Sequence, residues 1–179
     1  LFLKKSFIVI TMTSILNIMK DCLGDKSKLK DVLNLNQKAI LSTIANNGLV
    51  SVVKPRQTGV TTALVYYVAN LMKYSYQRKN IAFFTPHYSI GEDFLKKLGF
   101  MLRGYYENNL KVNKKDLYLE GSYCKAVHDY DKLIGARYDV IIVDEAAYNK
   151  NLENILLNSC AALTKEGKLI CVSSLGGAN

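Results

Sequence analysis

Residues 49–62 read LVSVVKPRQTGVTT. Four of the first five are apolar and three are β-branched valines, which is typical of a strand buried in a parallel sheet. Pro55 and Gly59 then mark a loop, and residues 61–74 have the composition of a helix that packs on a sheet. This order of strand, glycine-containing loop and helix suits a phosphate-binding loop, whose pattern is G-x-x-x-x-G-K-[ST]. The stretch therefore predicts an α/β fold with an anion site where the strand passes into the helix.

The loop departs from that pattern in the position of its lysine. Aligned on Gly59, the hydroxyl that binds Mg²⁺ falls at Thr61. Val60 stands where the lysine is usually found, and Lys54 occupies the position of the first glycine. We therefore expect the long side chain of Lys54 to reach over the loop to the β- and γ-phosphates. Arg56 adds a second cation to the loop.

Strands and helices alternate through the rest of the chain. The patterns predict helices at 36–47, 88–103 and 151–163, strands at 81–85, 140–143 and 169–173, and a small hairpin with strands at 117–119 and 123–127. Such alternation favours a mostly parallel central sheet with helices on both faces. Ligands of these sheets bind outside the carboxyl ends of the strands, and the motifs of this chain lie at such ends.

A second chemical motif follows the fully apolar run VIIV at residues 140–143. Asp144 and Glu145 come directly after it. Phosphoryl transfer uses one carboxylate to hold hydrated Mg²⁺ and another to orient or deprotonate water. Neighbouring residues of a strand point to opposite sides, so the two acids can divide these roles. The loop and the acidic pair together predict nucleotide hydrolysis.

These residues carry a family resemblance. The string RQTGVTT at residues 56–62 resembles the R-Q-x-G-K-T-T loop of the large terminase subunit of tailed bacteriophages, and Lys54 is similar to a variant in which the lysine begins the motif. Short motifs at comparable places extend the resemblance over roughly residues 34–177. They are Gln37 ahead of the first strand, Thr85-Pro86-His87, Gly135-Ala136-Arg137 and Ser173-Ser174.

The resemblance implies a role for each matching residue. Glu145 is the expected catalytic carboxylate, assisted by Lys54 and Arg56. Thr61 and Asp144 are the expected Mg²⁺ ligands, with ATP as the substrate. Ser173 and Ser174 are expected to couple hydrolysis to movement, and Gln37 to read adenine. The full nucleotide-binding set that the resemblance implies is Gln37, Lys54, Arg56, Gln57, Thr58, Gly59, Val60, Thr61 and Thr62.

The resemblance also implies an architecture and partners. We expect an α/β P-loop NTPase of the ASCE type over residues 34–179, without the nuclease domain of complete terminases. Residues 1–33 are expected to be an N-terminal segment that is partly ordered or precedes the native start. The implied partners are double-stranded DNA, a portal protein, a small terminase subunit and further copies of the chain in a ring. The implied location is the host cytoplasm, at the procapsid portal.

Composition agrees with a globular domain. The chain has 179 residues, 49% of them hydrophobic, which argues against intrinsic disorder and suits one domain. Its four cysteines are scattered, so we expect no zinc site. The apolar stretch at residues 6–19 is too short and too polar to span a membrane, and no cleavage site follows it, so we expect no secretion.

A net charge of +9 favours a polyanionic partner. The candidate DNA contacts are two groups of lysines, although such charge runs more often form a solvated face: Lys96 and Lys97, and Lys111, Lys114 and Lys115. His87 and His128 are more typical of ordinary residues at strand ends.

Two alternatives stay open at this point. A superfamily 2 helicase or related DNA translocase also has an acidic strand and a serine-rich coupling motif, but it usually keeps G-K-T in its loop. A non-hydrolysing module that binds nucleotide or DNA would keep the sheet without the turnover.

Overall fold

The computed structural model describes residues 33–55, 58–75, 77–103 and 109–174. These form, in chain order, α2 (Leu35–Asn46), β1 (Leu49–Lys54), α3 (Val60–Tyr74), β2 (Asn80–Phe84), α4 (Tyr88–Arg103), β3 (Leu110–Val112), β4 (Asp116–Leu119), β5 (Ser122–Val127), η2 (Tyr130–Leu133), β6 (Tyr138–Val143), η3 (Ala146–Tyr148), α5 (Leu152–Ala162) and β7 (Leu163–Ser174). Of the N-terminal segment at residues 1–33, all but Leu33 lies outside the described residues. No helix within the described ranges is long and apolar enough to cross a membrane.

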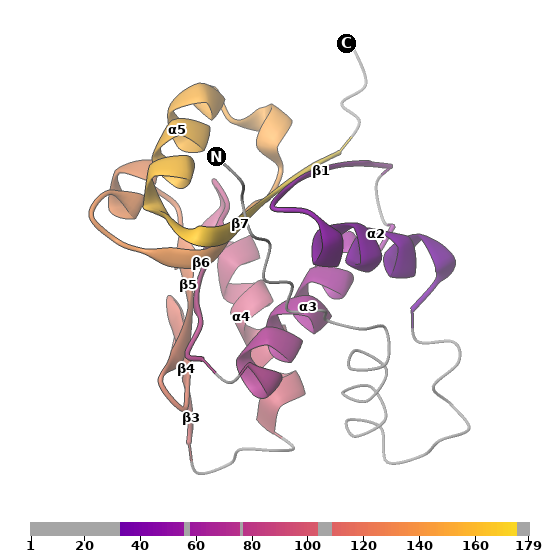
Figure 1. The fold of residues 1–179 in the computed structure, drawn as a ribbon, viewed down its shortest axis with the longest axis vertical. Coiled ribbons are helices and arrows are strands. Elements are labelled where there is room, and N and C mark those ends of the chain that lie inside the picture. Colours follow the sequence, from indigo (N-terminus) through magenta and orange to yellow (C-terminus); the bar gives the residue numbers. More distant parts are fainter. Residues whose placement is uncertain (1–32, 56–57, 76, 104–108, 175–179) are drawn as a thin grey trace.

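The strands form one seven-stranded sheet in the order β1-β7-β6-β2-β5-β4-β3. The strands from β1 to β5 in this order run parallel, and β4 and β3 extend the sheet in antiparallel fashion. The prediction of a mostly parallel sheet is therefore confirmed. The chain crosses from β1 to β2 through α3, which leaves room for β6 and β7 between these two strands (Figure 1).

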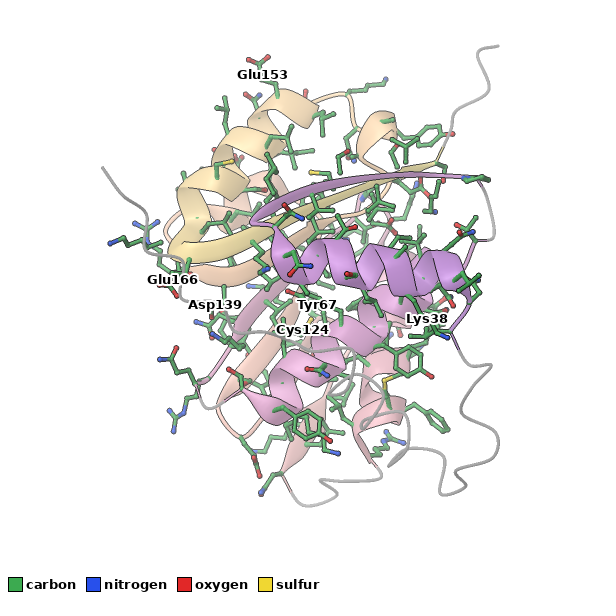
Figure 2. The ribbon with its side chains drawn as sticks, turned by 45° about the vertical axis from the view of Figure 1, so that its right-hand side comes forward. Lys38, Tyr67, Cys124, Asp139, Glu153 and Glu166 are labelled. Carbon is green, nitrogen blue, oxygen red and sulfur yellow. The ribbon has the colours of Figure 1, made fainter. Side chains whose placement is uncertain are left out.

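Helices cover both faces of the sheet, as predicted. On one face α2, α3 and α4 pack in a large core that includes Tyr67 and Cys124, both labelled in Figure 2. Within this core Phe83 of β2 stacks on Phe94 of α4, with ring centroids 4.0 Å apart. On the other face Ile155 of α5 belongs to a second, smaller core with residues of β2, β6 and β7. Figure 1 shows α3 and α4 on one side of the sheet and α5 on the other.

Strand β1, which was predicted to be buried, lies at the edge of the sheet, and its Leu49 and Val53 are 70% and 62% exposed. The 3₁₀ helices η2 and η3 were not predicted. The other strands differ from the prediction in three places. Strand β3 was not expected, because the three residues LKV are too short to show an alternating pattern. Strand β7 begins at Leu163 rather than at 169, because its first half is polar and pairs with β6 through an irregular register. The predicted hairpin is part of the main sheet, since β5 also pairs with β2 in parallel.

The two edges of the sheet have different roles. The carboxyl ends of β1, β7, β6 and β2 meet at one edge, where Lys54 pairs in register with Ser174 and Asp144 N donates a hydrogen bond to Phe84 O (2.9 Å). At the opposite edge, where the parallel strands begin, hydrogen bonds join neighbouring strands. There Asp139, labelled in Figure 2, accepts a hydrogen bond from Asn80 N (2.9 Å). The first edge thus holds Lys54, Asp144 and Ser174, whereas Gly135-Ala136-Arg137 directly precedes β6 and lies at the opposite edge, contrary to the expectation that all motifs follow strands.

Candidate active site

The loop after β1 is described at both of its ends, whereas Arg56 and Gln57 lie outside the described residues. Gly59 precedes α3 with a φ of 72°, a left-handed conformation that favours glycine. Gly59, the N-cap residue of α3, has no side chain that could cap the first turn, and the backbone N–H groups of a helix N-terminus suit an anion. The half-exposed Thr61 and the exposed Thr62 lie in this turn, and the half-exposed Thr58 precedes Gly59.

Val60 occupies the position where a lysine is usual, and its side chain is 1% exposed within the core under α3. A cation at this position would have to leave the core to reach a phosphate. Val60 therefore packs in the core, which agrees with the expectation that the phosphate-binding lysine is Lys54.

Lys54 lies at the end of β1, and its Nζ atom contacts two residues from other strands. It is 3.6 Å from Glu145 Oε1 and donates a hydrogen bond to Ser174 Oγ at 3.3 Å. The side chain of Lys54 is 12% exposed and that of Glu145 is 25% exposed, so the ion pair is partly shielded from water. Parallel pairing of β1 with β7 brings these groups together from distant parts of the chain.

Asp144 and Glu145 leave β6 in different environments. Asp144 is 4% exposed, and its Oδ1 atom is buried without a hydrogen-bond partner. Burial raises the pKa of the Asp144 carboxyl, and the negative charge of Glu145 raises it further, while Lys54 opposes the shift. Glu145 adopts a φ of 50°, which is uncommon for a residue with a side chain and often marks functional sites.

The two serines at the end of β7 contact the acidic segment directly. Ser174 Oγ donates to Glu145 Oε1 at 3.0 Å, and Ser174 N donates to Glu145 Oε2 at 3.4 Å. Ser173 Oγ accepts from Ala147 N at 3.2 Å. The residues that the resemblance links to coupling thus hold the expected catalytic carboxylate and the backbone just after it.

Gln37 lies next to the loop, but its side-chain amide is already bonded to the chain. Oε1 accepts from Asn34 N at 2.9 Å and Nε2 donates to Gly59 O at 2.9 Å. Asn34 Oδ1 in turn accepts from Gln37 N, which completes a capping box at the start of α2. Gln37 therefore ties α2 to the glycine of the loop, and adenine recognition by this residue stays a prediction.

The contact between Gln37 and Gly59 was not predicted, although the capping box that orients the Gln37 side chain has a sequence signal. Asn34 and Gln37 have the spacing of a capping box, an oxygen-bearing cap followed three residues later by Gln. A second missed contact gives no such signal. Asn149 Nδ2 donates to Glu145 O at 3.1 Å from the turn after η3.

His128 and Thr85 form a second polar contact at the same edge. The imidazole Nδ1 atom lies 2.8 Å from Thr85 O, and the ring packs on Tyr88 with centroids 4.0 Å apart. Thr85 is fully buried. His128 thereby joins the end of β5 to the end of β2, which is a structural role of the kind expected for a strand-end histidine.

The donor set suits a magnesium ion that is shared with phosphate. The orphaned Oδ1 of Asp144 is a buried carboxylate oxygen, and Thr61 supplies a hydroxyl, both of which are hard oxygen ligands. Within the described ranges no group of three or more His, Cys, Asp or Glu side chains could hold a metal by itself. Mg²⁺ in phosphate sites needs only one or two protein ligands, because substrate oxygens and water complete its shell.

Comparisons with known proteins show where else this fold occurs. No family model and no curated protein matches the chain. Among solved structures, the large terminase ATPase domain of Thermus phage P74-26 matches with a TM-score of 0.56 and 16% identity, over 78% of this chain and 65% of that one. The large terminase of bacteriophage HK97 matches with a TM-score of 0.64 and 14% identity, over 79% of this chain and 33% of that one.

A helicase structure is also similar. Dbp5 of S. cerevisiae, in a complex that contains ADP, matches with a TM-score of 0.62 and 13% identity, over 92% of this chain and 47% of that one. The chain thus spans less than two thirds of the length of each of these three structures. The chain has the fold of a P-loop ATPase domain, and large terminase ATPase domains of phages are among its structural neighbours.

Proposed function

We propose that this chain is the ATP-hydrolysing motor domain of a viral large terminase subunit, which drives double-stranded DNA into procapsids. The observation that carries the proposal is the junction of Lys54, Ser174 and Glu145 at the carboxyl edge of the sheet. A cation, a coupling serine and a carboxylate from three strands meet there beside the buried Asp144. Similarity to terminase ATPase domains supports the same function.

Each side chain has a proposed task in hydrolysis. Lys54 and Arg56 bind the triphosphate and stabilise the charge that develops on its γ-phosphoryl group. Glu145 orients or deprotonates the attacking water. Asp144 and Thr61 hold Mg²⁺, which when bound neutralises charge on the β- and γ-phosphate oxygens. The remaining loop residues, Gln57, Thr58, Gly59, Val60 and Thr62, shape the backbone around the phosphates, and Gln37 lies on the adenine side.

The contacts of Lys54 suggest how substrate binding readies the site. Without nucleotide, Lys54 partly neutralises Glu145 and shares Ser174 with it. A triphosphate attracts Lys54 more strongly than one carboxylate, because it carries several negative charges. Movement of Lys54 to the triphosphate leaves Glu145 held by Ser174 alone and free to accept a proton. Ser173 and Ser174 then pass this change along β7, which is the proposed coupling to DNA movement.

The proposed partners follow from the same function. They are double-stranded DNA, a portal protein and a small terminase subunit, with several copies of the chain assembled as a ring on the portal. The site of action is the host cytoplasm, at the portal of the procapsid.

The deciding experiment measures phosphate release from ATP with Mg²⁺, with and without linear duplex DNA. Wild type is expected to hydrolyse ATP, and Glu145→Gln is expected to keep ATP binding while its turnover falls by a factor of about 100 or more. Glu153→Gln, which changes an exposed carboxylate on α5 (Figure 2), is the matched control and should hydrolyse ATP as wild type does. ATP binding without turnover in the wild type would favour a non-hydrolysing module.

A helicase-like DNA translocase is the second candidate, and the match to Dbp5 favours it. Two assays separate the candidates. Packaging of DNA into procapsids that carry a portal supports the terminase function. Displacement of an annealed strand, without packaging, supports the helicase function.

A further inference from the structure

The outer part of the sheet has one covered face and one open face. On the covered face Leu110, Leu117 and Cys124 belong to the core under α4. Side chains alternate along a strand, so the residues next to Leu110, Leu117 and Cys124 on their strands point to the opposite face of the sheet. Figure 1 shows α5 over β6 and β7 on that side and no described helix over β3 and β4. We call this surface the open face, and it consists of Lys111, Asp116, Tyr118, Tyr123 and Lys125 together with Lys114 and Lys115 at the β3–β4 turn.

Aromatic rings cross the open face in a row. Lys111, Tyr118 and Tyr123 are register partners on β3, β4 and β5. The ring centroids of Tyr118 and Tyr123 are 6.1 Å apart, and those of Tyr123 and Tyr138 are 6.2 Å apart. Exposure rises along the row, from 1% at Tyr138 to 45% at Tyr118. The row thus has a buried anchor at β6 and presents an exposed ring beside Lys111.

The turn that carries Lys114 and Lys115 has a fixed backbone, and the lysines of the open face have few acidic neighbours. Asn113 Oδ1 accepts hydrogen bonds from Lys115 N (2.8 Å) and Asp116 N (2.7 Å), which fixes the turn. Lys111, Lys114 and Lys115 are exposed and form no ion pair with any described residue. Asp116 lies opposite Lys125 in the register and directly follows Lys115, so it offsets part of the positive charge of this face.

The other group of lysines that the sequence suggested is electrostatically balanced. Lys96 lies 3.1 Å from Glu92, and Lys97 follows Asp93 by one helical turn on α4. Two lysines and two carboxylates therefore share the exposed surface of this helix. Of the two groups, the lysines of the open face therefore have the larger net positive charge.

We propose that the open face binds the backbone of DNA, with Lys111, Lys114 and Lys115 on phosphates and the ring of Tyr118 against a sugar or base. The occupant is a nucleic acid because the described residues of this face include no exposed aliphatic side chain that an apolar helix would need. Cations beside an exposed aromatic ring are typical of surfaces that bind nucleic acid without reading sequence. The proposal rests on the proposed function for its choice of DNA, but it needs no hydrolysis.

The first test compares the two groups of lysines by fluorescence anisotropy of the full chain with a labelled DNA duplex at several salt concentrations. Lys114→Ala with Lys115→Ala is expected to weaken binding about tenfold at low salt and to lower the slope of log K against log salt by about 2. Lys96→Ala with Lys97→Ala removes the same charge from α4 and is expected to bind like wild type. Equal losses in the two double variants, or a loss only in the α4 variant, would overturn the proposal.

The second test concerns the ring. Tyr118→Ala is expected to weaken binding of duplex or single-stranded DNA about tenfold, whereas Tyr118→Phe keeps it within about twofold. Unchanged binding of both DNA forms by Tyr118→Ala would overturn the role of the ring. The thermal midpoint of each variant is measured as well, and it identifies any variant that has lost its fold. If Tyr118→Ala does not fold, Lys111→Ala is tested instead, and its DNA affinity is expected to fall by the amount that one phosphate contact contributes.

The outcomes separate this proposal from the proposed function, since binding is measured without nucleotide. If wild type hydrolyses ATP while the open-face variants bind DNA normally, the open-face proposal alone is wrong. If the open-face variants lose DNA while wild type shows no hydrolysis, the proposed motor function alone is wrong.

Discussion

Lys54 and Glu145 form an ion pair, with 3.6 Å between Nζ and Oε1, across the carboxyl ends of β1 and β6. These two strands are not neighbours, because β7 lies between them. Ser174 at the end of β7 bridges the gap, since its Oγ atom accepts from Lys54 and donates to Glu145. The candidate active site is therefore a contact between three strands, and the first predictions test its members separately.

Lys54→Ala is expected to lower ATP turnover by a factor of about 100 or more, because a cation that clamps the triphosphate is lost. Adding Val60→Lys restores the usual loop pattern in sequence, yet it is not expected to rescue turnover. Val60 is 1% exposed, so a lysine there disturbs the core. Steady-state phosphate release measures both effects. Normal turnover in Lys54→Ala would show that Lys54 does not replace the usual lysine. Rescue by Val60→Lys would show that position 60 can present a lysine to the phosphates despite its burial.

Ser174→Ala is expected to lower kcat about tenfold and to leave the KM for ATP within about twofold. The reason is that Ser174 contacts Glu145 and Lys54 in the nucleotide-free protein, so its loss misplaces the carboxylate more than the substrate. Ser51→Ala, an exposed serine of β1, is the matched control. A rise in KM without a change in kcat would contradict a role in positioning Glu145.

Asp144→Asn is expected to raise the free energy of unfolding of the nucleotide-free protein while abolishing hydrolysis. The native state raises the pKa of Asp144, chiefly by burial, so it holds the proton more tightly than the unfolded state does. This group therefore lowers stability as pH rises from the ordinary pKa of an aspartate through the raised one. Chemical denaturation at pH 4 and pH 7 measures the gain, which should be larger at pH 7.

The same variant tests the proposed metal ligand. Mg²⁺ with a non-hydrolysable ATP analogue is expected to raise the thermal midpoint of wild type but not that of Asp144→Asn. Equal stabilisation of both proteins would argue against Asp144 as a ligand.

Gly59→Ala is expected to destabilise the protein by about 1–3 kcal/mol. Its φ of 72° disfavours a side chain, and a Cβ atom there would overlap Gln37 Nε2. In a Gln37→Ala background the overlap is absent, so the same substitution should cost only about 1 kcal/mol. A double-mutant cycle by urea denaturation measures the coupling. Additive effects would show that Gln37 and Gly59 do not act together.

Lys168→Met is expected to destabilise the fold by about 1–3 kcal/mol through the end of α2. Lys168 Nζ donates to Ile44 O (2.7 Å), Ala45 O (2.9 Å) and Asn47 O (3.1 Å), so β7 caps this helix. Lys165→Met, an exposed lysine of the same strand, is the control and should change stability by less than about 0.5 kcal/mol. Equal effects of the two substitutions would rule out capping as the cause.

Much of the fold was predictable because its signals are local. The apolar runs of β2 and β6 lie within one or two residues of the predicted strands, since a strand that is buried on both faces has a continuous apolar sequence. The bounds of β1 were also predicted within one residue, although β1 is an edge strand and only Val50 is buried in it. The polar first half of β7 gives no such signal, and neither does the short strand β3. Those elements exist because neighbouring strands supply their hydrogen bonds, which sequence periodicity does not record.

The sequence by itself determined the chemistry that is available to this protein. It placed a displaced lysine and a glycine at the end of one strand, two acids at the end of another and two serines at the end of a third. Only the tertiary structure decided that Lys54, Glu145 and Ser174 touch, because the order of strands in the sheet is set by crossovers far apart in the chain. It also decided that Val60 packs in the core, that Gln37 binds the loop glycine, and that one group of lysines lies on an uncovered face of the sheet.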